Sequence, residues 1–104
     1  MPKTALREFV RTYAENRPGI YQMLGEGGRP LYVGKSVQVR SRLLSYFTAA
    51  PGEMAAKLIG EAVHIRWEYV PNEFAALVRE MKLIQRWRPR FNVQHKRERA
   101  YAFV

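Results

Sequence analysis

The sequence predicts one small α/β domain of the α+β type, in which three strands combine with four helices. Its 104 residues are 47% apolar, which is enough for one core but too little chain for two independent domains. Four segments have the apolar spacing or composition of helices, and three others are rich in the β-branched and aromatic residues typical of strands. We therefore expect a single domain over residues 1–104, with its core at about 17–93 and a basic tail at 94–104.

The N-terminal third predicts a helix followed by a hairpin. Apolar side chains recur at helical spacing between residues 6 and 13, and the Asn-Arg-Pro-Gly sequence at 16–19 stops that helix. Two apolar, aromatic-rich runs follow at 20–24 and 31–33, and the glycine-rich segment 25–30 between them has the composition of a turn. We expect these two runs to pair as antiparallel strands.

The middle of the chain predicts two helices. Ser36 is a favourable N-cap residue, and the apolar side chains that follow it mark one side of a helix that ends near Thr48. Pro51-Gly52 then interrupts the chain before a short helical segment at 53–60.

The C-terminal third predicts a third strand and a long helix. Apolar and polar residues alternate from 63 to 70, as in a strand with one buried face. Asn72 can cap a helix over 73–87, and Arg88-Pro89 ends it because a residue before proline avoids the helical region. The last residues are basic and then apolar, so the tail could form a further strand.

Charge and composition narrow the possible partners. Lys and Arg total 18 against nine acidic residues, a net charge of +9, which favours a polyanion such as nucleic acid; the alternative is a charge that serves only solubility. The absence of cysteine excludes a disulfide framework, a thiolate zinc site and a cysteine nucleophile. No window approaches the ~20 apolar residues of a membrane span, and the N-terminus lacks a signal pattern, so we expect no membrane partner and a cytoplasmic location.

One acidic residue stands out in the long predicted helix. Glu80 lies within about 60° of Leu77, Ile84 and Trp87 on a helical projection, and therefore within an apolar face. A carboxylate in such a place requires a cation, a metal ion or a hydrogen-bond donor. An internal salt bridge and a metal site both remain open. Trp67 and Trp87 are assigned to the core.

The preceding helix offers groups suited to phosphate. Arg42 and Tyr46 are four residues apart and therefore neighbours, and Lys35 follows Gly34, where a missing side chain would allow a ligand to approach. A guanidinium can bind phosphate through two parallel hydrogen bonds. Taken alone, Lys35 and Arg42 have ordinary solvated charge as the alternative, and Tyr46 has core packing.

Taken together, these residues resemble the GIY-YIG nuclease superfamily. Gly19-Ile20-Tyr21 and Tyr32-Val33-Gly34 match its name-giving pair at about the usual separation. The likeness continues through Lys35, Arg42, Tyr46, Glu80 and the Arg88-Pro89-Arg90-Phe91-Asn92 block. It covers roughly residues 17–93 and is greatest to the N-terminal nuclease domain of UvrC-type excinuclease subunits.

The resemblance implies a central three-stranded sheet flanked by helices. It also implies a metal-dependent DNA endonuclease that attacks the phosphodiester with water in line, as a repair-type or structure-specific nicking activity. Glu80 would hold one divalent ion, Mg²⁺ or Mn²⁺, and Tyr21 or Tyr32 would activate the water. Phosphate contacts would come from Lys35 and Arg42. The full set of catalytic residues that it implies is Tyr21, Tyr32, Lys35, Arg42, Tyr46, Glu80 and Asn92.

Further basic residues near the C-terminus are candidates for sequence-independent contact with the DNA backbone. They are Arg88, Arg90, Lys96 and Arg97. A solvated basic tail is the alternative for this cluster, and a non-cleaving nucleic-acid-binding module on the same scaffold is the alternative for the whole chain. Because 104 residues leave no room for the other domains of a UvrC-type protein, we expect a further DNA-binding domain or repair partner outside this chain.

Overall fold

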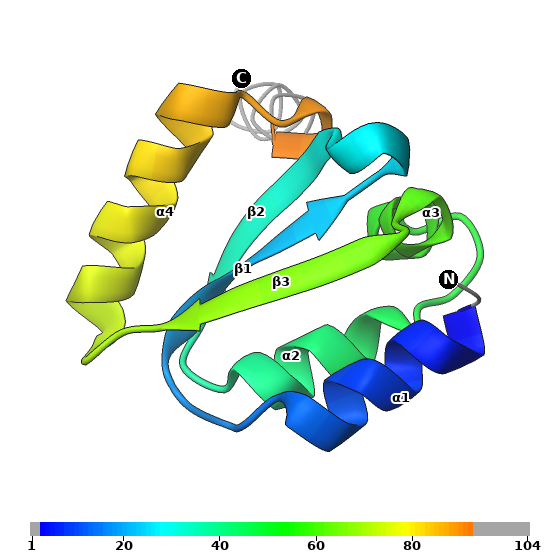
Figure 1. Cartoon of the computed structure of the whole chain (residues 1–104), viewed down its shortest axis with the longest axis horizontal. Coiled ribbons are helices and arrows are strands. Elements are labelled where there is room, and N and C mark those ends of the chain that lie inside the picture. The colour runs from blue at the N-terminus through cyan, green and yellow to red at the C-terminus, as the bar shows by residue number, and fades with distance from the viewer. Residues whose placement is uncertain (1–2, 93–104) are drawn as a thin grey trace.

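The computed structural model describes residues 3–92. A three-stranded antiparallel sheet of order β2-β1-β3 lies at its centre (Figure 1). The strands are β1 (Gly19–Leu24), β2 (Pro30–Ser36) and β3 (His64–Tyr69). The helices are α1 (Lys3–Tyr13), α2 (Val39–Tyr46), α3 (Met54–Glu61) and α4 (Glu73–Trp87). The predicted hairpin, third strand and flanking helices are thus confirmed.

Helices cover the sheet on both faces, and the alternation of side chains along the central strand β1 separates two cores. Tyr21 and Met23 point toward α1, α2 and α3, whereas Ile20 packs against α4 on the other face. The larger core joins the three N-terminal helices to the sheet, and the smaller one consists of Ile20, Val33, Ala76 and Leu83. Figure 1 shows α4 standing apart from α1 and α2 across the sheet.

The segment that follows α4 is anchored in the larger core. Pro89 and Phe91 are fully buried, although Arg88 and Arg90 beside them are exposed. Arg88 has a left-handed conformation with φ 43°, and its N–H donates to the carbonyl of Ile84, which ends α4 at the predicted residue. Burial of the proline and the phenylalanine therefore fixes where Asn92 lies.

The two helix caps predicted from the sequence have different outcomes. Asn72 caps α4 as expected, because its Oδ1 accepts a hydrogen bond from the Ala75 N–H at 2.8 Å. The prediction for Ser36 is wrong: it ends β2, and its Oγ accepts instead from the Gln38 N–H at 2.9 Å within the turn. Helix α2 begins only at Val39.

Trp87 is also not where the sequence placed it. We expected a core residue, but 46% of its surface is exposed at the C-terminal end of α4. Trp67 is partly buried and packs against the larger core, as expected.

Residues 93–104 lie outside the described part of the chain, and with them the predicted tail strand and the candidate DNA contacts Lys96 and Arg97. Within residues 3–92, no helix is both long and apolar enough to cross a membrane.

Candidate active site

Packing explains the two glycines of the Gly-Ile-Tyr and Tyr-Val-Gly sequences. The strand register places Tyr21 directly opposite Gly34, and the Tyr21 ring lies so close that a Cβ at Gly34 would overlap it. A Cβ at Gly19 would overlap the carbonyl oxygen of Glu68 on β3. We expected Gly34 to admit a ligand, but the space is filled by a tyrosine of the protein itself.

Three tyrosines form a cluster on the α2 side of the sheet. The hydroxyls of Tyr21 and Tyr46 are hydrogen-bonded at 2.7 Å, and the Tyr32 ring centroid lies 6.1 Å from that of Tyr21. Tyr21 and Tyr46 are only 1% and 3% exposed, whereas Tyr32 is partly exposed. The Arg42 guanidinium carbon lies 5.0 Å from the Tyr46 ring centroid. Tyr32 is therefore the member of the cluster that solvent reaches.

The surroundings of the cluster favour the neutral, protonated form of its three phenols. Burial raises the pKa of Tyr32 to about 12, and the proximity of Tyr46 and Glu80 adds to the rise. Burial likewise raises the pKa of Tyr21 and of Tyr46. Arg42 opposes the rise at all three tyrosines. The cation that favours a phenolate here is thus Arg42.

Glu80 lies on the side of α4 that faces the sheet. It falls between Ala76 and Leu83, which are both buried, and is itself partly buried. Burial raises the pKa of its carboxyl group, and the positive charge of Lys35 opposes that rise. Of the apolar neighbours that the helical projection suggested, Ile84 packs against the smaller core, whereas Leu77 and Trp87 are exposed.

No salt bridge or hydrogen bond reaches the Glu80 carboxylate from residues 3–92. The internal salt bridge that the sequence left open is therefore not formed within that part of the chain. A partly desolvated carboxylate without a protein partner is a suitable hard ligand for a divalent cation.

The remaining ligand chemistry also suits magnesium. Residues 3–92 contain no group of three or more His, Cys, Asp or Glu side chains that could together hold a metal. A metal at Glu80 would thus keep much of its coordination sphere for water and phosphate oxygens, which is how Mg²⁺ commonly binds in phosphate-processing enzymes. The residues present fit such an ion.

The site straddles the free edge of the sheet. Lys35 lies opposite Ile20 in the strand register, on the face covered by α4, whereas Tyr32 lies opposite Met23 on the other face. Because β2 is an edge strand, groups from both faces can meet around it. Glu80 on α4 lies near enough to Tyr32 to add to the rise of the Tyr32 pKa.

Asn92 holds this edge strand. Its Oδ1 accepts a hydrogen bond from the Val33 N–H at 2.8 Å, and its Nδ2 donates to the Val33 carbonyl at 2.9 Å. Val33 lies between Tyr32 and Gly34, so Asn92 fixes the backbone that carries the exposed tyrosine. This is the geometry of a positioning residue.

The candidate DNA-contacting residues divide into two groups. Lys35 and Arg42 reach the site, and Arg88 is exposed beyond the end of α4. Arg90 is paired with Glu61, with a nitrogen to oxygen distance of 2.6 Å, so its charge is already compensated. This pair could not be predicted because Glu61 lies in α3, 29 residues before Arg90.

Comparison with known proteins identifies the family of this arrangement. A family model for the UvrC-like GIY-YIG domain matches residues 17–93. UvrABC system protein C is 36% identical over 97 residues in Aquifex aeolicus, a match that covers 92% of this chain and 17% of that protein. The Pseudomonas protegens protein of the same name is 38% identical over 97 residues, with 92% and 16% covered. The chain spans about a sixth of the length of these relatives.

A solved structure has the same fold. The GIY-YIG N-terminal endonuclease domain of UvrC from Thermotoga maritima, bound to magnesium as its catalytic divalent cation, superposes with a TM-score of 0.74 at 29% identity. The match covers 88% of this chain and 98% of that one. The likeness therefore extends over nearly the whole of a domain of known structure.

Proposed function

The chain belongs to the UvrC-like GIY-YIG family of endonuclease domains, and on that premise we propose that it hydrolyses phosphodiester bonds of DNA with the help of one divalent cation, Mg²⁺ or Mn²⁺. The observation that carries the proposal is the Glu80 carboxylate. It is partly desolvated, has no partner within residues 3–92, and lies close enough to Tyr32 and Lys35 for each pair to interact electrostatically.

The charges of the site match the needs of the reaction. Phosphodiester hydrolysis builds negative charge on the non-bridging and leaving oxygens. A divalent cation held by Glu80 supplies a Lewis acid at this point. Lys35 and Arg42 bind phosphate oxygens from the two sides of the edge strand, and the Tyr46 ring orients the Arg42 guanidinium.

Tyr32 is the proposed general base. Tyr21 and Tyr46 are buried and bonded to each other, so water reaches the Tyr32 hydroxyl most readily. Its pKa of about 12 keeps it neutral near pH 7. Tyr32 therefore accepts a proton from the attacking water only as the phenolate, which the positive charge of Arg42 favours; a cation held by Glu80 would favour it further.

The proposed substrate and partners follow from charge and length. A net charge of +9 favours the DNA backbone, and Arg88 lies where it can extend the contact. We further propose that this cleavage is a repair-type or structure-specific nicking activity. The relatives named UvrABC system protein C are about six times longer, so we propose that residues or proteins outside this chain select the target and bind repair partners.

Nicking of supercoiled plasmid DNA tests the proposal. We expect cleavage with Mg²⁺ or Mn²⁺ and none with EDTA, and a loss of at least about 100-fold in Glu80→Gln. Glu73→Gln, which changes an exposed acid in the first turn of the same helix, is the matched control and should cut normally. Full metal-dependent activity in Glu80→Gln would disprove the role of Glu80. DNA binding without nicking under all conditions would favour the non-cleaving module.

A further inference from the structure

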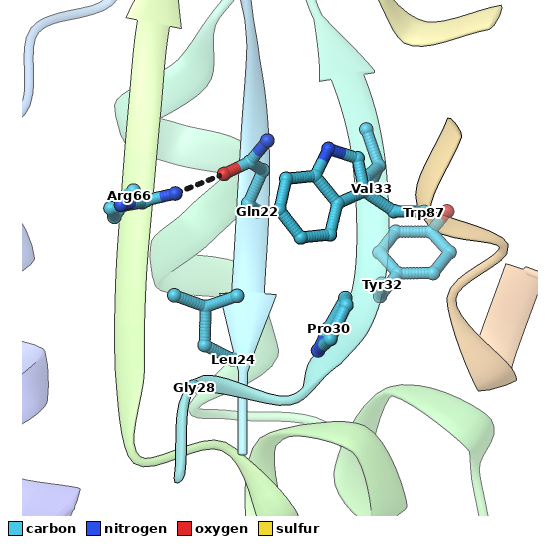
Figure 2. Close-up of a pocket in the computed structure, with 8 residues that line it drawn as sticks. All are labelled: Gln22, Leu24, Gly28, Pro30, Tyr32, Val33, Arg66 and Trp87. Atoms are coloured by element: carbon cyan, nitrogen blue, oxygen red, sulfur yellow. Dashed lines mark hydrogen bonds between the residues drawn. The ribbon is translucent and has the colours of Figure 1, made fainter. Parts of the chain in front are cut away.

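A second concave site lies beside the catalytic groups, between the C-terminal end of α4 and the hairpin of β1 and β2 (Figure 2). Its cavity has a volume of about 150 Å³, a size known to hold one aromatic ring. The residues that shape it are Gln22, Leu24, Pro30, Tyr32, Arg66 and Trp87. Apart from Tyr32, none of them belongs to the proposed hydrolytic machinery.

Flat apolar surfaces form the walls of this cavity. Trp87 lines the cavity and is 46% exposed in total, which is unusual for an indole that could have packed into a core. Figure 2 shows its ring lying alongside β1 and β2, with Leu24 and Pro30 toward the hairpin end. A half-exposed aromatic ring over an apolar cavity is a suitable platform for stacking.

Polar and charged groups complete one side of the cavity. The Arg66 guanidinium donates to the Gln22 Oε1 at 3.2 Å, which orients the Gln22 amide so that its NH₂ group remains available as a donor (Figure 2). The Arg86 guanidinium carbon lies 5.8 Å from the Trp87 ring centroid and adds positive charge near that ring. These donors can bind the carbonyl oxygens and ring nitrogens of a nucleobase edge.

We propose that this pocket binds one unpaired nucleobase of the DNA strand, stacked on Trp87 with its polar edge toward Gln22 and Arg66. That the ligand belongs to DNA rests on the proposed function. Tyr32 lines both this pocket and the tyrosine cluster, so the bound base lies close to the phosphate that is cut. The pocket thus allows the site to distinguish an unpaired base next to the cut from a paired one.

Tryptophan fluorescence provides a direct test. The chain has two tryptophans, so Trp67→Phe leaves Trp87 as the single reporter. In EDTA, a short thymidine oligonucleotide should quench this emission, whereas an abasic oligonucleotide of the same length and charge should not. Because base stacking on an aromatic side chain is worth about 5- to 150-fold in affinity, Trp87→Ala in the full chain should weaken thymidine oligonucleotide binding by that factor.

Matched controls isolate the pocket from charge and folding. Phe74→Ala removes another exposed aromatic side chain from α4, outside the pocket, and should leave binding unchanged. Affinity for the abasic oligonucleotide should be equal in Trp87→Ala and the wild type. Equal quenching by both oligonucleotides, or equal losses in Trp87→Ala and Phe74→Ala, would overturn the proposal. Tighter binding of a ribo-oligonucleotide would overturn the assignment to DNA.

The binding test is independent of hydrolysis. It is made in EDTA, so quenching by the thymidine oligonucleotide supports the pocket even if plasmid nicking is never observed. Conversely, nicking that is lost in Glu80→Gln supports the hydrolytic role even if the thymidine and abasic oligonucleotides behave alike.

Discussion

Replacing Gly34 by alanine should destabilise the domain through a single clash. The backbone at Gly34 does not need positive φ, so alanine brings no conformational strain. Its Cβ would overlap the ring of Tyr21, which is 1% exposed and hydrogen-bonded to Tyr46. Overpacking costs about 1–3 kcal/mol, and a displaced buried hydrogen bond adds about 1 kcal/mol. We therefore expect a loss of about 2–4 kcal/mol, a large part of the stability of a small domain.

Urea denaturation of Gly34→Ala and of a control measures this cost. Gly60→Ala is the control because a Cβ there meets nothing within 4 Å, and alanine in α3 should add about 0.5–1 kcal/mol of stability. In a Tyr21→Leu background the ring that the new Cβ would overlap is absent, so Gly34→Ala should reduce the free energy of unfolding markedly less there. The reasoning fails if Gly34→Ala lies within about 0.5 kcal/mol of wild type, or if its cost is the same in both backgrounds.

Three further outcomes follow from the same site. Tyr46→Phe leaves the buried Tyr21 hydroxyl without its partner and should cost about 1–3 kcal/mol in urea denaturation; a neutral result would contradict the 2.7 Å bond. The pKa of Tyr32 is about 12 in the folded protein and near ~10 when unfolded, so its stabilisation is complete below about pH 10 and is lost as pH rises toward 12. Tyr32→Phe should therefore lessen alkaline destabilisation by up to about 3 kcal/mol, and identical pH profiles from denaturation would argue against the shift. Asn92→Ala should cost about 1–3 kcal/mol and speed hydrogen exchange at the Val33 amide, whereas unchanged exchange would mean that the side chain does not hold that strand.

The strands and most helix limits could be predicted because their signals are local. The alternation at 63–70 and the Asn72 cap depend on residues close in sequence, and the structure has both. The prediction that Ser36 caps α2 was wrong because the first N–H groups of that helix bind the loop at residues 15–17 instead. The N–H groups of Val39 and Arg40 donate to the carbonyls of Arg17 and Glu15. That loop is remote in sequence, so a local cap rule could not include it.

The residues of the site could be predicted from the sequence, but only some of the contacts between them could. Helical geometry orders residues around α4 but does not say which side meets the sheet, so the exposure of Trp87 could not be foreseen. The packing of Tyr21 on Gly34 depends on strand register, which joins residues 13 apart in the chain. The pairing of Arg90 with Glu61 is likewise a contact between distant segments.

The two hydrogen bonds between Asn92 and Val33 also affect whether the protein associates with itself in concentrated solution. An edge strand presents free amide and carbonyl groups that another extended chain can pair with, which is a route to aggregation. Asn92 takes both of these groups at Val33, in the middle of β2. One side chain thus blocks the β2 edge of the sheet at Val33, next to Tyr32 of the candidate site, so loss of Asn92 should promote self-association through β2.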